Sequence, residues 1–475
     1  MTPSHTHTGP HAGCGDADDL DVEEALALVR PPKSDRTDQV DRADRTGRAD
    51  RTGRADRTGR AGPGPARPAG HEHPHHKATP WPEARETAAR AAHRATRRPH
   101  VSVALGNALG LVLAGPLDAL SDLPSFDTSA MDGWAVAGPG PWRIRDGGVL
   151  AGHAPPEPLT DGEAVRIATG ARVPAGVTAV LRSEHGRTGP QDRLHSTSEM
   201  SHGQDIRPRG QECRRGDQLL PTGTLVTPAV LGLAAAAGYD TLTVVPRPRA
   251  EVLVLGDELL TEGLPHDGLI RDALGPMLAP WLRALGAEVI AVRRLGDDAK
   301  ALRRAITTSR ADLIVTTGGT AAGPVDHVHP TLERIGADLL VDGVAVRPGH
   351  PMLLARTRAD QHLVGLPGNP LAAVSGLLTL AEPLLRALAA RPEPEPYRMP
   401  LREAVQVHAH DTRLVPVVLR GERAVPLRYS GPAMLRGVAT ADALAVVPPG
   451  GAAQGAGLEL LDLPWDTAGI GMCFT

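Results

Sequence analysis

The sequence predicts a multi-domain α/β protein whose largest domain is a doubly wound, mainly parallel sheet with helices on both faces. Three observations support this fold class. The chain of 475 residues is long enough for two to four domains with their own cores. Residues 250–391 alternate strand-like apolar runs with helix-like runs, the order typical of a parallel sheet. Short runs broken by glycine and proline on either side of this stretch indicate smaller β-rich domains.

The amino-acid composition excludes several classes of function. Lysine plus arginine (51) nearly balance aspartate plus glutamate (55), so no excess of positive charge favours nucleic acid or an anionic membrane. The 3 cysteines are far apart and fit neither a disulfide framework nor a zinc spacing. The start of the chain is polar, and Asn107, Pro116 and Asp118 interrupt the most apolar stretch, residues 101–120. We therefore expect a cytoplasmic protein without a membrane span.

Residues 1–78 are expected to form a disordered, low-complexity tail. The unit ADRTGR recurs from Ala43 and is followed by runs rich in proline, glycine and histidine. A repeat without apolar positions cannot build a core, so the segment should stay solvated. The histidines at 71, 73, 75 and 76 could bind a transition metal weakly, although their spacing implies no fixed geometry.

The globular pattern begins at Trp81. The alanine-rich run at 82–95 predicts a helix, and the short runs at 128–205 predict a small β domain. Residues 224–246 predict a helix that closes at Gly238 and is followed by a strand. Short β-like runs after residue 393 predict a separate β domain at the end of the chain.

The strands of the α/β stretch are expected at 250–256, 288–296, 311–319 and 362–370, and its helices at 274–287, 298–309 and 371–390. Ligands of such sheets bind at the carboxyl ends of the strands. Three of these ends carry Gly256-Asp257-Glu258, the glycine-rich run 318–323 with Asp326, and Pro367 to Pro370. Backbone amides bind phosphate oxygens, and nearby carboxylates can share a Mg²⁺ with that phosphate. Each loop alone is compatible with a plain turn or helix cap, but together they favour a phosphate-bearing ligand.

A second group of polar residues lies in loops outside this stretch. It comprises Asp127, Ser129, Asp132 and Thr169-Gly170. A hairpin turn at Asp132-Gly133 is the alternative interpretation. The loop 318–323 has neither the GxxxxGK[ST] nor the GxGxxG pattern, so ATPase and nicotinamide functions have no fingerprint here.

The order of seven motifs resembles the molybdopterin molybdenumtransferases, the MoeA and gephyrin E-domain family. The motifs are FDTSAMDGWAV (126–136), IATGARVPAG (167–176), DIRPRGQECRRGDQLLPTGTLVTP (205–228), VLGDELL (254–260), TGGTAAGPVDH (317–327), VRPGHPMLLA (346–355) and GLPGNPLAAV (365–374). The resemblance covers about residues 80–450, and SAMDG followed by GLPGNP is highly specific.

The resemblance implies a domain order. A Mog-like α/β domain would span 246–392, a small β domain 128–205 and a β-barrel-like C-terminal domain 393–475, while 79–127 and 206–245 would form a helical linker domain. It also implies a homodimer whose active site lies between the Mog-like domain of one subunit and the SAMDG domain of the other.

The family inserts molybdenum from molybdate into adenylylated molybdopterin with Mg²⁺ and releases AMP. A molybdopterin adenylyltransferase and apo-molybdoenzymes are the protein partners that this implies. By position, the resemblance assigns catalysis to Asp132, Thr169, Glu258, Asp297 and Asp326, with Glu258 and Asp326 also holding the metal. The pterin-phosphate site would comprise Gly318, Gly319, Gly323, Arg347, His350, Pro367, Gly368, Asn369 and Pro370.

Several positions depart from the family pattern. Arg347 and His350 stand where the family has lysines, Gly343 replaces a further lysine, and Ala321 replaces a serine. Arginine can still hold a phosphate by its fork of donors, whereas histidine is only partly charged near neutral pH. Two alternatives therefore remain: a catalytically impaired paralogue that carries molybdopterin, and a molybdopterin adenylyltransferase, which would leave the SAMDG and TGARVP segments unused. Molybdate and tungstate are both compatible with the site.

Overall fold

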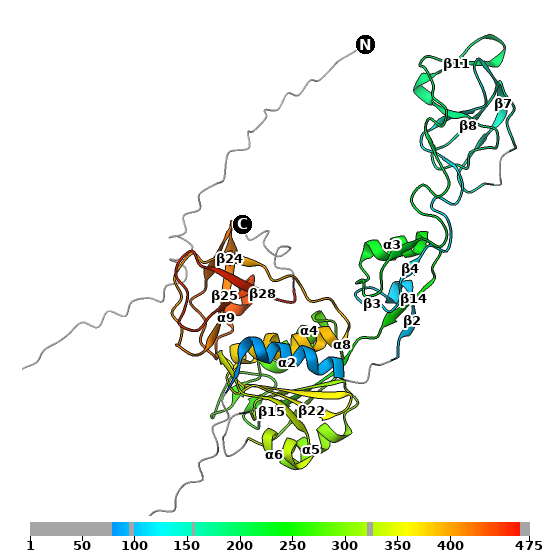
Figure 1. Ribbon diagram of the computed structural model, residues 1–475. Coiled ribbons are helices and arrows are strands. Elements are labelled where there is room, and N and C mark those ends of the chain that lie inside the picture. The colour runs from blue at the N-terminus through cyan, green and yellow to red at the C-terminus, as the bar shows by residue number, and fades with distance from the viewer. Residues whose placement is uncertain (1–77, 95–98, 154–156, 321–325, 466–475) are drawn as a thin grey trace, which may run out of the picture. The chain divides into compact units, whose positions relative to one another are not determined.

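The computed structural model of the chain describes residues 78–94, 99–153, 157–320 and 326–465 (Figure 1). All of these residues belong to one unit of the chain, His73–Thr475. The predicted tail, with its repeats and histidines, therefore lies outside the described residues apart from Ala78.

A six-stranded sheet forms the centre of the α/β domain. Its order is β18 (Glu288–Leu295), β15 (Arg249–Leu255), β19 (Leu313–Thr317), β23 (Gln361–Leu366), β22 (Leu353–Arg358) and β20 (Asp338–Asp342). The first four strands are parallel and the last two pairings are antiparallel, which confirms a mainly parallel sheet. All five residues of β19 are buried, as expected of a strand covered on both faces.

Helices cover both faces of this sheet (Figure 1). They are α4 (Leu274–Ala284), α5 (Ala299–Thr308), α6 (Val328–Arg334) and a continuous helical run of α7 (Pro370–Gly376), η4 (Leu377–Ala381) and α8 (Glu382–Leu388). Successive residues of β19 point to opposite faces, so Leu313 and Val315 join the core under α4 and α8 while Ile314 joins the core under α5 and α6.

The run Pro370–Leu388 is the one helix among the described residues that is long and apolar enough to cross a membrane. Most of it (83%) is buried inside the protein, where its leucines form the centre of the larger core. It is therefore a core helix of the α/β domain.

The predicted first helix is α2 (Trp81–Arg94), but its packing differs from the expected one. Ala84 and Ala88 are fully buried in the core of the α/β domain, and the Trp81 Nε1–H donates to Thr379 Oγ1 at 3.0 Å. The resemblance places this segment in a linker domain. It lies instead against α8 and η4, because its alanine face allows close packing on the apolar helix.

The rest of the expected linker, 101–127 and 206–245, is more strand than helix. It contains the sheet β2 (Val101–Ala104), β14 (Thr241–Val245) and β3 (Val112–Leu113), and the pair β13 (Gln218–Leu220) with β4 (Leu117–Asp118). Its strand β12 (Ile206–Arg207) pairs with β5 (Thr128–Ser129), at the start of the expected small β domain. Its helices are η1 (Leu105–Asn107) and α3 (Pro228–Ala236). The order of α3 and then β14 agrees with the prediction for 224–246, and the alternating run TLTVV explains the strand.

The small β domain is one six-stranded sheet with some short turns. Its order is β10 (Gly186–Thr188), β11 (Arg193–Ser196), β7 (Trp142–Val149), β8 (Glu163–Ile167), β6 (Gly133–Val136) and β9 (Ala179–Arg182), with η2 (Ser183–His185) and η3 (Pro190–Asp192) between strands. Gly133 lies inside this sheet, so Asp132-Gly133 is the start of a strand and not a hairpin turn. A Cβ on Gly133 would lie 1.9 Å from the Leu181 carbonyl oxygen, so only glycine fits there.

The C-terminal domain is a curled sheet that includes strands from earlier in the chain. Its order is β1 (Thr79–Pro80), β21 (Val344–Arg347), β25 (Thr412–Arg420), β27 (Ala443–Val447), β28 (Gly457–Asp462) and β24 (Arg398–Pro400), with β26 (Arg423–Pro426) beside β25 and α9 (Arg436–Ala439) preceding β27. Because β21 pairs with β25, this sheet continues across the expected domain boundary near residue 392.

Candidate active site

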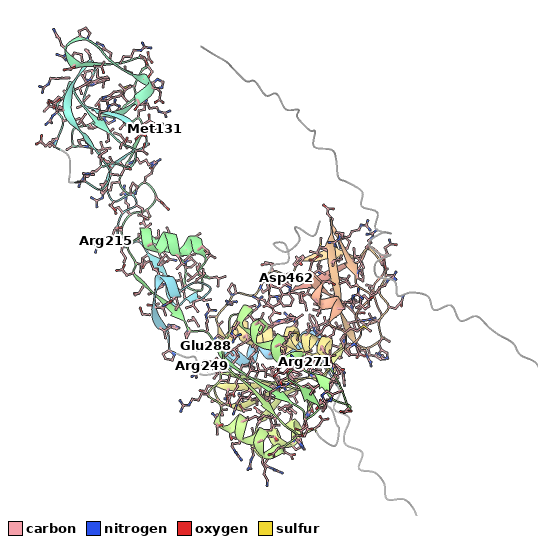
Figure 2. All side chains as sticks on the ribbon, turned by 180° about the vertical axis from the view of Figure 1, so that it is seen from behind. Met131, Arg215, Arg249, Arg271, Glu288 and Asp462 are labelled. Carbon is pink, nitrogen blue, oxygen red and sulfur yellow. The ribbon has the colours of Figure 1, made fainter. Side chains whose placement is uncertain are left out.

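Three loops at the carboxyl ends of parallel strands surround a pocket of about 250 Å³. They follow β15, β18 and β19, and Figure 2 marks the opposite end of the sheet, where Arg249 and Glu288 begin β15 and β18 side by side. The lining residues are Leu255, Gly256, Glu258, Gly296, Asp297, Asp298, Leu302, Gly318, Gly319, Asp326 and His327. The structure thus brings together three of the five predicted catalytic residues with two glycines of the predicted phosphate loop.

The glycine turn after β19 requires its glycines. Gly318 has φ +74° and Gly319 has φ +66°, the left-handed region that strains any residue with a Cβ. The Gly318 N–H donates to the Leu366 carbonyl at 2.8 Å, and a Cβ on Gly368 would lie 3.8 Å from Gly318 Cα. The turn therefore lies beside the loop that contains Pro367, Gly368 and Asn369, as predicted from the neighbouring strands. Gly323 and Ala321 lie outside the described residues.

The acidic loop after β15 folds back on itself. Gly256 has φ +126°, and a Cβ there would lie 2.3 Å from Glu258 Oε2. The Glu258 carboxylate thus covers Gly256 at the rim of the pocket. The Gly256 N–H donates to the Leu295 carbonyl at 3.2 Å, which joins this loop to the end of β18.

The loop after β18 brings two further carboxylates to the pocket. Asp297 lines the pocket, and Asp298 is the N-cap of α5, accepting a hydrogen bond from the Lys300 N–H at 2.7 Å. Hydrogen bonds from the backbone N–H groups of Lys300 and Ala301 lower the pKa of the Asp298 carboxyl below its ordinary value. Among the described residues, no lysine or arginine lines this pocket, so it favours a cation over a bare anion.

The donor set of the pocket fits a hard divalent cation that is shared with a ligand. Glu258, Asp297 and Asp326 offer only carboxylate oxygens. Within the described residues, no three acidic, histidine or cysteine side chains gather closely enough to hold a metal by themselves. Mg²⁺ commonly binds through one or two carboxylates together with water and substrate phosphates. The assignment of Glu258 and Asp326 as its ligands remains a prediction.

Two predicted phosphate-binding residues lie apart from this pocket. Arg347 Nε donates to Asp411 Oδ2 at 2.5 Å, so its guanidinium is engaged by the C-terminal domain. His350 is exposed, with Nδ1 at 3.0 Å from the Val344 carbonyl oxygen, and it faces the space where Gly343 lacks a side chain. Neither residue lines the pocket.

Asp132 and Thr169 meet in the small β domain. Asp132 precedes β6, Thr169 follows β8, and the Thr169 N–H donates to Asp132 Oδ1 at 2.7 Å. The Ser183 N–H and hydroxyl both donate to the Asp132 carbonyl, at 3.0 and 3.1 Å. Both predicted residues are exposed, and the hydrogen bond from Thr169 orients the Asp132 carboxylate.

Residue-based reasoning missed the acidic loop after β18. Its run Gly296-Asp297-Asp298 repeats the glycine-acid-acid pattern of residues 256–258, and both follow parallel strands, the buried β15 and the half-exposed edge strand β18. Asp297 was assigned only through the resemblance, although the repeated pattern was the available signal.

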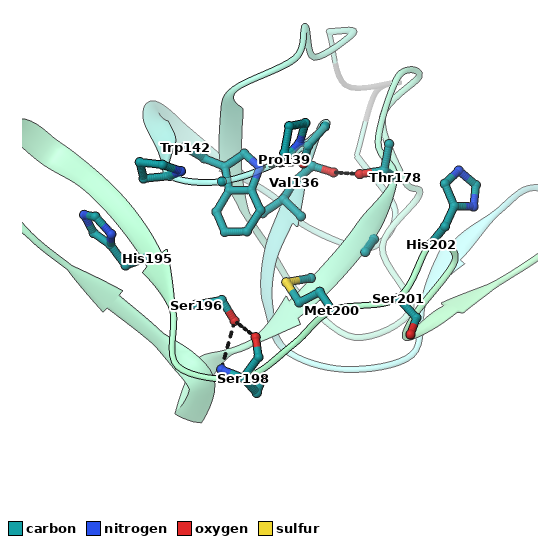
Figure 3. A pocket seen from close by; sticks show the side chains of 14 residues that line it. Val136, Pro139, Trp142, Thr178, His195, Ser196, Ser198, Met200, Ser201 and His202 are labelled. Atoms are coloured by element: carbon teal, nitrogen blue, oxygen red, sulfur yellow. Dashed lines mark hydrogen bonds between the residues drawn. The ribbon is translucent and has the colours of Figure 1, made fainter.

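A second pocket, of about 610 Å³, lies on the small β domain (Figure 3). Trp142, Val136 and Met200 form its apolar part, and serines and histidines lie around it. It contains none of the predicted site residues. Some of its hydroxyl groups form hydrogen bonds within the domain; the Thr178 hydroxyl, for example, donates to the Val136 carbonyl.

Comparisons with known proteins agree over the three parts of the chain. Residues 79–238 match the MoeA N-terminal region (domains I and II), 251–387 a probable molybdopterin-binding domain, and 398–463 the MoeA C-terminal region (domain IV). The chain is 35% identical to molybdopterin molybdenumtransferase 2 of Mycobacterium tuberculosis over 383 residues (76% of this chain and 94% of that protein). It is 28% identical to the molybdopterin molybdenumtransferase of Staphylococcus aureus over 392 residues (79% and 93%).

A solved structure is similar over the same extent. The molybdopterin biosynthesis MoeA protein of Pyrococcus horikoshii superposes with a TM-score of 0.67 and 26% identity, covering 82% of this chain and 100% of that one. The motifs, the glycine turn beside an acidic pocket and these similarities lead to one conclusion: the chain belongs to the molybdopterin molybdenumtransferase (MoeA) family.

Proposed function

We propose that this protein inserts molybdenum from molybdate into adenylylated molybdopterin and releases AMP in a Mg²⁺-dependent reaction. Membership of the family makes it a transferase of molybdenum cofactor biosynthesis. The observation that supports Mg²⁺-dependent insertion with release of AMP is the pocket in which Glu258, Asp297 and Asp326 lie beside the turn Gly318-Gly319.

The charges of the pocket explain why a cation is required. Molybdate and the diphosphate of the pterin nucleotide are anions, and carboxylates alone would repel them. When bound, Mg²⁺ would supply the positive charge that offsets this repulsion and stabilises negative charge as the anhydride breaks. Glu258 and Asp326 would hold the ion, and the side-chain-free turn would leave room for phosphate oxygens near backbone amides.

The remaining predicted residues complete this proposal. Asp132 and Thr169 would come from the second subunit of a homodimer, as the family resemblance implies. The Thr169 N–H already orients the Asp132 carboxylate for such a role. Arg347, His350 and the loop Pro367 to Pro370 would contact the pterin nucleotide outside the acidic pocket. We place the enzyme in the cytoplasm, where a molybdopterin adenylyltransferase would supply the nucleotide and apo-molybdoenzymes would accept the product.

One observation favours a second candidate, a carrier that binds the pterin nucleotide without turnover. Arg347 replaces a family lysine and is paired with Asp411, and Gly343 provides no cation at all. Fewer cationic groups are therefore available to the transition state than in the family pattern. This candidate predicts nucleotide binding with no release of AMP.

The deciding experiment uses the purified full chain with adenylylated molybdopterin and Mg²⁺, with molybdate, with tungstate or with neither. AMP released only when an oxyanion is present supports the transferase, and comparison of the two oxyanions gives its preference. Measurable nucleotide binding without any oxyanion-dependent AMP release would overturn the transferase and leave the carrier.

A further inference from the structure

We propose that Asp257 is a positioning residue that holds Asp297 in the acidic pocket, and that Gly296 is a glycine because the Asp257 carboxylate occupies the place of its side chain. This inference deepens the proposed function, and the expected change in kcat rests on that function. The structural contact itself does not.

Asp257 behaves differently from its neighbours in the loop after β15. Gly256 and Glu258 both line the pocket, whereas Asp257 does not. Its carboxylate reaches across to the loop after β18, where Oδ2 accepts a hydrogen bond from the Asp297 N–H at 3.3 Å. The side chain therefore joins two loops that each bring a carboxylate to the pocket.

The other carboxylate oxygen explains Gly296. A Cβ on Gly296 would lie 2.3 Å from Asp257 Oδ1, and the next nearest atoms are Asp257 Cγ at 3.2 Å and Oδ2 at 3.4 Å. The backbone of Gly296 is outside the left-handed region, so its conformation does not require glycine. The three nearest atoms all belong to one carboxylate, which is therefore the reason that a side chain does not fit.

Asp297 is fixed on both sides by this arrangement. On one side its N–H is bonded to Asp257. On the other, the Asp298 N–H donates to the Gly296 carbonyl at 2.7 Å, and the Asp298 side chain caps α5. The Cα of Asp297 thus lies between a cross-link and a helix start, which sets the direction of its carboxylate into the pocket. Small displacements of such a group can cost up to about 100-fold in rate.

The test is a double-mutant cycle on the full-length protein with Asp257→Ala, Gly296→Ala and the double variant. In chemical denaturation, Gly296→Ala should lower the unfolding midpoint of the wild type but leave that of Asp257→Ala nearly unchanged, because the space for the methyl group is then empty. Gly115→Ala is the matched control, since a Cβ there meets nothing within 4 Å and its φ is not positive. If the midpoint shifts of Asp257→Ala and Gly296→Ala simply added in the double variant, the proposed contact between the two residues would be overturned.

The functional part of the inference uses the same proteins. We expect kcat for AMP release to fall about tenfold in both single variants with KM for the nucleotide within about twofold, and the double variant to be no slower than either. Asp257→Asn keeps an acceptor for the Asp297 N–H and should lose only about threefold. Equal losses for Asn and Ala would show that the charge, not the position, matters, and would overturn the positioning role.

Binding of Mn²⁺, read by electron paramagnetic resonance with the nucleotide present but without an oxyanion, separates this inference from the proposed function. We expect several-fold weaker Mn²⁺ binding in both single variants and no further loss in the double. If the wild type released no AMP, the proposed function would fail while the Mn²⁺ and denaturation cycles still decided the role of Asp257. Unchanged Mn²⁺ affinity in Asp257→Ala and Gly296→Ala would overturn that role.

Discussion

His362 should make the protein less stable as the pH falls from about 7 to about 4. The residue lies in β23, in the middle of the six-stranded sheet, and its side chain is fully buried. Neither ring nitrogen has a hydrogen-bond partner. Burial, together with a smaller effect of the charge of Arg356, lowers the pKa of His362 from 6.5 to about 4, while Asp360 opposes the shift.

The direction of this pH effect on stability follows from proton binding in the folded and unfolded states. Between pH 6.5 and pH 4 the unfolded chain binds a proton at this histidine and the folded chain does not, so acid favours unfolding. For these two pKa values the loss is about 2 kcal/mol at pH 5 relative to pH 7.5, and it approaches about 3 kcal/mol below pH 4. At pH 7.5 both states are neutral at this position and the contribution vanishes.

The assay is urea denaturation of wild type and His362→Leu at pH 7.5 and pH 5. Wild type should lose about 2 kcal/mol more than the variant between these pH values, because leucine cannot take up the proton. The leucine should also stabilise the protein slightly at pH 7.5 by removing two unpaired polar atoms from the core. Removal of the exposed His153 is the control and should leave the wild-type pH difference in place. If His362→Leu loses as much as wild type on acidification, the reasoning about this buried histidine is refuted.

Four further predictions concern the site and the domains. Asp326→Asn should lower turnover on the order of 100-fold while nucleotide affinity changes far less, and equal losses would mean a structural role. Removing divalent cations with EDTA should weaken nucleotide binding, measured by calorimetry, by about tenfold or more, and unchanged binding would contradict the shared-cation pocket. Gly133→Ala should destabilise the protein by about 1–3 kcal/mol in denaturation, because its Cβ meets the backbone of β9, whereas a cost no larger than that of Gly115→Ala would refute this. Deleting residues 1–78 should leave the Tm and the activity close to unchanged, and a large drop in either would show that the tail contributes to the fold.

The elements of the α/β domain were predictable because their sequences carry local signals. A short apolar run such as LIVTT, rich in β-branched residues, is typical of a strand covered on both faces, and the structure buries it at every position. The helix α5 that precedes it in the chain shows an apolar stripe. What a buried face packs against is not a local property. The alanine face of α2 indicates burial, but its partner is a helix almost 300 residues later. Likewise, nothing near β21 predicts its pairing with β25 across the domain boundary.

The site shows the same division between local and long-range information. Glu258, Asp326 and the glycines at 318 and 319 were found because parallel strands must end at one edge of the sheet. The pairing of Arg347 with Asp411, 64 residues away, was not predictable, since nothing in the sequence near either charge points to the other. The sequence could show that a lysine had become an arginine. Only the structure shows that this arginine is already engaged.

The pairing of Arg347 with Asp411 bears on how the lost lysines of the family pattern are interpreted. A site that has lost lysines would ordinarily be expected to bind anions more weakly. Here, however, the pocket beside the glycine turn is lined by carboxylates, so under the proposed function the phosphates would bind there through a cation whether or not lysines are present. Arg347 and His350 would then contact the part of the nucleotide outside that pocket, where loss of charge would affect affinity more than the breaking of the anhydride. The substitutions are therefore compatible with turnover, and oxyanion-dependent release of AMP, more directly than the affinity for the nucleotide, distinguishes the transferase from a carrier.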